Sequence, residues 1–204
     1  MNKQQLFTNL DKHLTNDEKP SEYMKTVFED PVIKEYPFEL LYKLSLTEQS
    51  KEHHPEGNVL NHTLLVIDEA AKVREKSKDK RAFMWAAFLH DIGKPSTTKE
   101  RKGKITSYNH DKIGAKLAKD FLTYFEEEPQ FIKQVTMLIF YHMQILFVVK
   151  NNGKADIEGM KKKADIDEIA LLGLCDRLGR GKDNKSEEEE NIRRFLRICK
   201  ENGR

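Results

Sequence analysis

The stretch from Arg81 to Pro95 reads Arg-Ala-Phe-Met-Trp-Ala-Ala-Phe-Leu-His-Asp-Ile-Gly-Lys-Pro, and it decides the fold. Its first nine residues are apolar nearly all round, which predicts a central, buried helix. Gly93 permits a left-handed turn and Pro95 cannot continue a helix, so we expect the helix to end there. His90 and Asp91 therefore stand at a buried helix end. A carboxylate in that position predicts a cation, an ion pair or a metal, because an unpaired buried charge is costly.

Helical spacing continues on both sides of this segment. The polar residues 96–109 predict a loop that allows one small β-hairpin near 97–107, turning at Lys102-Gly103. Further helices are expected at about 58–77, 110–125, from 129 onward and at 165–177. We therefore expect an all-α helical bundle. Its main domain would span 54–182, with a helical layer at 1–53 packed on it and a C-terminal helix at 183–204.

The composition is that of a water-soluble protein. Of 204 residues, 38% are hydrophobic and 34% are charged, and 36 basic residues nearly cancel 34 acidic ones. This balance gives no global indication of nucleic acid or a membrane as partner, although local patches leave nucleic acid open. Nothing in the sequence indicates an oligomeric state.

The two cysteines, Cys175 and Cys199, have no CxxC spacing, which argues against a disulfide framework and a thiolate zinc site. The first residues lack the apolar core of a signal peptide. The longest uncharged run, 134–149, is too short for a comfortable membrane span and reads as a buried helix. We therefore expect a cytoplasmic protein.

Four histidines and two aspartates lie at inward positions of the expected helices. Each has an ordinary structural explanation on its own: a histidine on an apolar face is usually a hydrogen-bonded core residue, Asp91 could pair with Lys94, and Asp176 could pair with a neighbouring arginine. Six such positions on five helices, without cysteine, instead favour the ligand set of Mn, Fe, Ni, Zn or Mg with open positions. The six are His62, His90, Asp91, His110, His142 and Asp176.

At these residues the sequence resembles the HD-domain metal-dependent phosphohydrolases, whose ordered signature is H…HD…D. His90-Asp91-Ile92-Gly93 matches the variant written HDIG. The chain is also similar to the HD region in the C-terminal part of some bacterial tRNA nucleotidyltransferases. That similarity covers about residues 50–182 and rests on His54-Pro55-Glu56-Gly57, Gly103-Lys104-Ile105, Tyr108-Asn109-His110 and Gly114-Ala115.

The resemblance implies a single HD-domain bundle that binds one or two divalent ions. One ion would be held by His62, His90, Asp91 and Asp176, and a second by Asp91 with His110 and His142. A second HD dipeptide occurs at His110-Asp111, where Asp111 more plausibly favours a helix N-terminus. The nucleotidyltransferase head is absent from these residues, so we expect a stand-alone hydrolytic module that does not add nucleotides to tRNA.

The expected reaction is attack of a metal-activated water on phosphorus in a phosphomonoester or phosphodiester of a small, nucleotide-like substrate. Asp91 and Lys94 are the expected catalytic residues. Lys94 lies one turn after His90, where it would contact phosphate or be a solvated lysine at a helix C-terminus. Arg177 or Arg180 would grip phosphate, although ion pairs explain both as well. The other expected substrate-binding residues, by resemblance only, are His54 and Glu56.

Two alternatives to hydrolysis remain open at this point. One is a di-iron oxygenase of the same fold that acts on a small molecule, and the other is a non-catalytic nucleotide-sensing module. The basic run 99–104 could attract an anionic substrate, but a solvated loop tip is the favoured interpretation.

Overall fold

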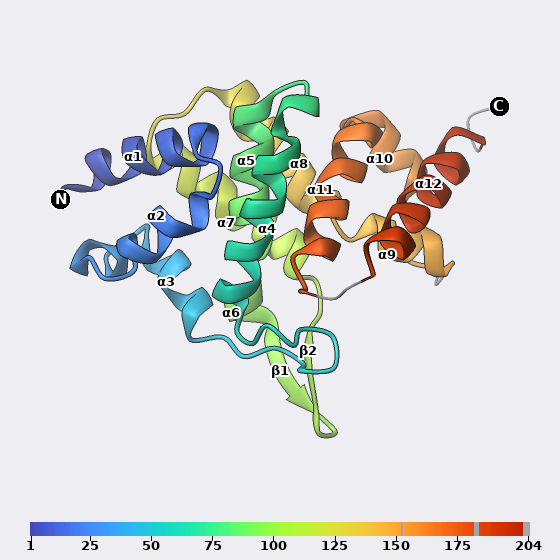
Figure 1. Cartoon of the computed structure of the whole chain (residues 1–204), viewed down its shortest axis with the longest axis horizontal. Helices are drawn as coiled ribbons and strands as arrows, with labels where there is room; N and C mark the ends of the chain where they lie inside the picture. The colour runs from blue at the N-terminus through green and yellow to red at the C-terminus, as the bar shows by residue number, and fades with distance from the viewer. Residues whose placement is uncertain (152, 182–183, 202–204) are drawn as a thin grey trace.

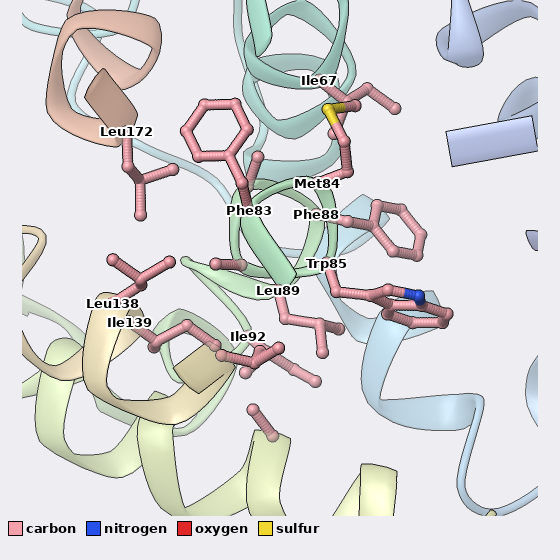
Figure 2. Packing of buried hydrophobic residues seen from close by; sticks show 14 of the residues in the cluster. Ile67, Phe83, Met84, Trp85, Phe88, Leu89, Ile92, Leu138, Ile139 and Leu172 are labelled. Atoms are coloured by element: carbon pink, nitrogen blue, oxygen red, sulfur yellow. The ribbon is translucent and has the colours of Figure 1, made fainter. Parts of the chain in front are cut away.

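Helix α5 (Lys80–Leu89) runs through the middle of the structure. The side chain of Asp79 accepts a hydrogen bond from the backbone N–H of Ala82 and so caps the first turn. Every residue from Ala82 to Leu89 is buried. Figure 2 shows the side chains of this helix pointing outward on all sides, toward Ile67, Leu138 and Leu172 of three neighbouring helices. The prediction of a central, buried helix is confirmed.

The computed structural model describes residues 1–151, 153–181 and 184–201, and helices surround α5 on every side. Helices α4 (Val59–Val73), α8 (Pro129–Tyr141) and α11 (Ile166–Leu178) pack directly against it. The other helical elements are α1 (Lys3–Asn16), α2 (Pro20–Val27), η1 (Pro31–Lys34), α3 (Glu39–Ser45), η2 (Arg74–Lys76), α6 (Lys94–Thr97), α7 (His110–Tyr124), α9 (Gln144–Lys150), α10 (Ile157–Lys163) and α12 (Lys185–Glu201). The all-α prediction is confirmed.

The N-terminal helices and the C-terminal helices flank the central ones from opposite sides (Figure 1). Helix α1 packs on α5, where the Phe7 ring stacks on Trp85 at 4.8 Å between centroids. Helix α12 packs on α9 and α11. The domain limit at 53/54 stays a prediction, and the limit at 182/183 and the end of the C-terminal helix at 202–204 lie outside the described residues.

One β-hairpin projects from the helical body at the bottom of Figure 1. Strands β1 (Thr98–Arg101) and β2 (Lys104–Ser107) pair antiparallel, with Thr98 opposite Ser107. Lys102 and Gly103 both have positive φ, 51° and 72°. A two-residue hairpin turn that matches the twist of its strands requires positive φ at both positions. The expected hairpin and its turn are therefore confirmed.

The role expected for Gly93 was wrong. Gly93 has φ −80° and ψ −16°, which is right-handed, so it makes no left-handed turn. It is needed for space instead: a Cβ there would lie 2.2 Å from the carbonyl oxygen of His110 and 2.6 Å from the backbone nitrogen of Gly114. Pro95 lies in the first turn of α6, where proline is tolerated. This close approach brings the start of α7 against the end of α5.

One helical stretch among the described residues, Pro129–Lys150, is long and apolar enough to cross a membrane by length and composition alone. Core helices of soluble proteins pass the same test, and 50% of its most apolar window is buried within the fold. The stretch is also divided, because α8 ends at Tyr141 and α9 begins at Gln144. It is weak evidence for a membrane.

Candidate metal centre

The six residues proposed as metal ligands converge at one place in the fold. His62 comes from α4, His90 and Asp91 from the end of α5, and His110 from the first residue of α7. His142 follows α8 directly, and Asp176 lies in the last part of α11. All six side chains are buried. Burial of so many polar groups in one cluster needs compensation by charge pairing, hydrogen bonds or a bound ion.

Asp91 lies between two halves of this cluster. Its Oδ2 is 3.2 Å from Nε2 of His90 and 3.8 Å from Nε2 of His62. Its Oδ1 is 3.4 Å from Nε2 of His110, and that nitrogen is 3.2 Å from Nε2 of His142. Each half contains a group of three potential ligand atoms that lie within 4.8 Å of one another. The carboxylate of Asp91 is thus placed to serve an ion in either half.

Backbone carbonyls fix the orientation of three imidazoles. Nδ1 of His90 lies 2.8 Å from the carbonyl oxygen of Ala87, and Nδ1 of His142 lies 2.6 Å from that of Ile139. Nδ1 of His110 is held in the same way at 2.7 Å by Ser107. A carbonyl oxygen can only accept, so each Nδ1 donates and, in the neutral ring, each Nε2 keeps a lone pair facing the cluster.

His62 is oriented by Glu56. Oε1 of Glu56 lies 2.8 Å from Nδ1 of His62 and 2.8 Å from Nδ1 of His54. Nε2 of His62 contacts Oδ1 of Asp176 at 3.0 Å. Glu56 therefore acts on the centre through His62, as the carboxylates behind metal-binding histidines do.

The carboxylates of the cluster are held in their ionised form. Burial alone would raise the pKa of Asp91, but the neighbouring His90 and Lys94 act in the opposite direction and hold the pKa well below its usual range. Burial would likewise raise the pKa of Asp176, yet Arg180 and His62 keep it well below. Ionised carboxylates are the form that binds metal.

The imidazoles differ in the direction of their pKa shifts. Burial, with His110 and His90 nearby, lowers the pKa of His142 to about 4. Burial also lowers the pKa of His110. For His62, burial acts downward but hydrogen bonds to Asp176 and Glu56 raise the pKa. A metal ion bound at Nε2 of His62 would compete with a proton for that nitrogen.

These residues fit a divalent cation. Nε2 of His110 and Nε2 of His142 both act as acceptors, so at 3.2 Å they cannot satisfy each other. Within the described part of the chain, buried Nε2 of His90 also lacks a hydrogen-bond partner. A cation between such lone pairs and the carboxylate of Asp91 removes the conflict. Nitrogen and oxygen donors without thiolate are compatible with several divalent metals.

The cluster opens into a cavity of about 1090 Å³. Lys94 and Arg180, both expected to bind substrate, line it together with His54. Lys94 is only 7% exposed; its Nζ lies 2.7 Å from Oδ2 of Asp91 and donates to Oε1 of Gln49 at 2.6 Å. It is thus a buried cation at the centre, and the interpretation as a solvated lysine is wrong. Nη2 of Arg180 lies 3.7 Å from Oδ1 of Asp176.

Arg177 and Glu56 do not line this cavity. Nε of Arg177 donates to Oε2 of Glu188 in α12 at 2.8 Å, so the structure gives this arginine an ion pair between helices. Asp111 is buried on the cavity wall, but the ligand groups found among the described residues leave it out.

Sequence reasoning missed several polar and aromatic lining residues. Gln49 and Gln144 are buried beside the cavity. For Gln144 the signal was an amide among apolar residues, whereas Gln49 lies in a polar stretch that gives no such signal. Tyr108 and Phe147 also line it. They lie close in sequence to His110 and His142, which is the signal that could have found them.

Comparisons with known proteins agree with this geometry. The family model described as HD domain matches residues 59–181, more than half of the chain. The multifunctional CCA protein of Mannheimia succiniciproducens is 28% identical over 152 residues, which cover 70% of this chain and 35% of that protein. That of Actinobacillus pleuropneumoniae is 38% identical over 72 residues, or 35% of this chain and 17% of that protein. That of Halorhodospira halophila is 46% identical over 52 residues, 26% of this chain and 12% of that protein.

The chain thus spans about a third or less of the length of these relatives. Their similarity confirms the resemblance to the HD region of tRNA nucleotidyltransferases. The matched family residues include all six of the convergent histidines and aspartates. The chain therefore belongs to the HD domain family, within the metal-dependent phosphohydrolase superfamily, and its buried histidine and aspartate cluster could hold a metal.

Proposed function

We propose that this protein hydrolyses a phosphomonoester or phosphodiester of a nucleotide-like substrate with a metal-activated water. One observation carries the proposal: imidazole lone pairs converge with Asp91 at an open cavity, and Lys94 and Arg180 lie against the aspartates of the cluster. Ligands for a divalent ion beside groups that pair with phosphate are what phosphoester hydrolysis requires.

The chain's residues divide into two ligand sets. His62, His90, Asp91 and Asp176 would hold one divalent ion, and Asp91 with His110 and His142 would hold a second. Such an ion supplies a water of lowered pKa and polarises a phosphoryl oxygen. Lys94 and Arg180 bind and orient the phosphoryl group, while Glu56 holds His62 in position and His54 lies at the cavity wall.

The names of the relatives support a substrate of nucleotide chemistry. The proteins matched are called multifunctional CCA proteins, so partners related to nucleotides or nucleic acids are consistent with this chain's family. The cavity of about 1090 Å³ is large enough for more than a phosphate group, since ligand pockets of this size bind drug-sized molecules.

The test combines metal content with a substrate panel. Wild type and Asp91→Ala are loaded with Mg, Mn, Ni or Fe, their bound metal is measured, and both are assayed on mono-, di- and cyclic phosphoesters. His13→Asn is the matched control, because His13 pairs with Asp17 on α1 outside the centre. We expect Asp91→Ala to lose bound metal and to fall to the background rate of hydrolysis, and the control to keep both.

Three results would contradict the proposal. The first is metal bound equally by wild type and Asp91→Ala, and the second is hydrolysis that the substitution leaves intact. The third is a wild type that holds iron, consumes oxygen and cleaves none of the phosphoesters, which would assign the centre to an oxygenase.

A further inference from the structure

The aromatic side chains of Tyr108 and Phe147 line the cavity and are not among the candidate metal ligands. Tyr108 is 54% exposed, although it lies on the wall that Asp91, His110 and His142 also form. Phe147, in α9, is half-buried on the same cavity. An exposed ring of this size contributes little to the core, and on the cavity wall it is accessible to a bound ligand.

The chain ties Tyr108 closely to the centre. Tyr108 precedes His110 by two residues, which limits their Cα atoms to a separation of about 7 Å. The intervening Asn109 is left-handed, with φ 62°, and the carbonyl of Ser107 holds Nδ1 of His110. The ring is therefore presented within a short reach of the ligands rather than at a distant surface.

Cations surround the two rings. The guanidinium carbon of Arg101, from β1, lies 4.8 Å from the centroid of the Tyr108 ring. Nζ of Lys154 lies 5.5 Å from the Tyr108 centroid and 5.9 Å from that of Phe147. Lys112 and Lys150 line the same cavity. Aromatic faces interleaved with cations are the arrangement that binds bases together with their phosphates.

We propose that Tyr108 and Phe147 form a base-stacking subsite for a nucleoside phosphate whose phosphoryl group lies at the metal centre. The inference rests on the proposed function and specifies its substrate class. Every base offers a π-face to Tyr108 and Phe147, whereas a sugar phosphate without a base offers none. Arg101 and Lys154 then pair with phosphates of the same ligand, either a free nucleotide or the terminal nucleotide of a single strand.

The kinetic test compares two substrates that differ only in the base: adenosine 5′-monophosphate and ribose 5-phosphate. Tyr108→Leu removes the ring, Tyr108→Phe keeps it, and Tyr124→Leu is a control at another exposed tyrosine that packs edge-on against Tyr36. We expect Tyr108→Leu to raise the ratio of KM for adenosine 5′-monophosphate to KM for ribose 5-phosphate about tenfold. Tyr108→Phe should restore the wild-type ratio. A ratio that Tyr108→Leu leaves unchanged would overturn the subsite.

A binding test separates this inference from the proposed reaction. Metal-free protein is titrated into 2-aminopurine ribonucleotide, and stacking is read as quenching of its fluorescence. Quenching by wild type that weakens about tenfold in Tyr108→Leu supports the subsite even if no phosphoester is cleaved. Absence of quenching by wild type overturns it even if hydrolysis is observed.

A third experiment distinguishes a free nucleotide from the end of a strand. Here the 2-aminopurine is the terminal base of a short oligoribonucleotide. Tighter binding of the strand, falling steeply with salt, identifies a strand terminus, because extra phosphates release counterions. Equal affinity for the mononucleotide and the strand identifies a free nucleotide. Both results require the same stacking, which Tyr108→Leu must weaken in each.

Discussion

Both ends of α5 carry charged or titratable groups, but only those at its start find matching hydrogen-bond partners within the protein. At its start, Arg81 donates to Glu127 through both terminal nitrogens at 2.8 and 2.7 Å, and its Nε donates to Asp11 at 2.7 Å. Nε1 of Trp85 donates to the same oxygen of Asp11 at 2.6 Å. At the other end, the helix leads into His90 and Asp91, where imidazole nitrogens that can only accept a hydrogen bond lie next to one another.

The difference separates a structural cluster from a ligand site. Hydrogen bonds to Glu127 and Asp11 hold the pKa of Arg81 above its usual range despite burial, as expected of a cation matched by the protein's own carboxylates. The centre at His90 and Asp91 lacks this internal match, because its lone pairs converge without enough donors. Burial of polar groups alone therefore does not identify a site; an incomplete set of partners does.

The largest effect expected from the contrast between the two ends of α5 is stabilisation of the folded protein by a bound metal. A ligand that binds only the folded protein, at a thousand times its Kd, raises the free energy of unfolding by about 4 kcal/mol. We expect that increase for wild type when a divalent metal replaces EDTA, measured by urea unfolding. Asp91→Ala should show little of it, because both ligand sets lose the carboxylate they share.

His13→Asn, outside the centre, controls for loss of a histidine and should keep the full increase. An equal gain in Asp91→Ala would mean that the metal binds elsewhere, and the contrast between the two ends of α5 would fail.

A smaller effect is expected from the carboxylate behind His62. Removing a group that orients a metal-binding histidine lowers metal affinity about 10- to 100-fold. We expect Glu56→Ala to lose that amount by isothermal titration with metal. Glu56→Gln should lose less, because its amide oxygen keeps an acceptor at the place where Oε1 of Glu56 lies 2.8 Å from Nδ1 of His62. An unchanged affinity in Glu56→Ala would show that the backbone alone orients His62.

Much of the fold and the inward placement of the six histidines and aspartates could be predicted from the sequence, because they depend on local patterns. The run that makes α5 apolar all round ends in His90-Asp91, and His142 lies on the apolar stripe of its helix. Covalent neighbours and helical spacing are enough to place such residues on an inward face.

What could not be predicted depends on how distant segments approach each other. Gln49 reaches Lys94 from 45 residues away, and Gly93 is required by the backbone of His110, contacts that no local pattern contains. The roles of the two arginines after Asp176 could have been told apart from their spacing. Four residues on, Arg180 would lie on the same side of a helix as Asp176, whereas the next residue, Arg177, points about 100° away. Arg177 accordingly meets Glu188 of α12.

The smallest expected effect comes from removing an ion pair at the start of α5, where Arg81 is matched by carboxylates. Arg81→Met removes the charge and keeps the length of the side chain. Arg81 is 34% exposed, so solvent already screens its ion pairs, and we expect the free energy of unfolding to fall by about 1–2 kcal/mol in urea. Metal affinity should match wild type, because the cluster at Arg81 shares no residue with the ligand sets and distant, independent sites act additively. A loss of metal affinity in Arg81→Met would show instead that the packing of α5 transmits strain from one end to the other, and the two clusters would have to be treated as one coupled system.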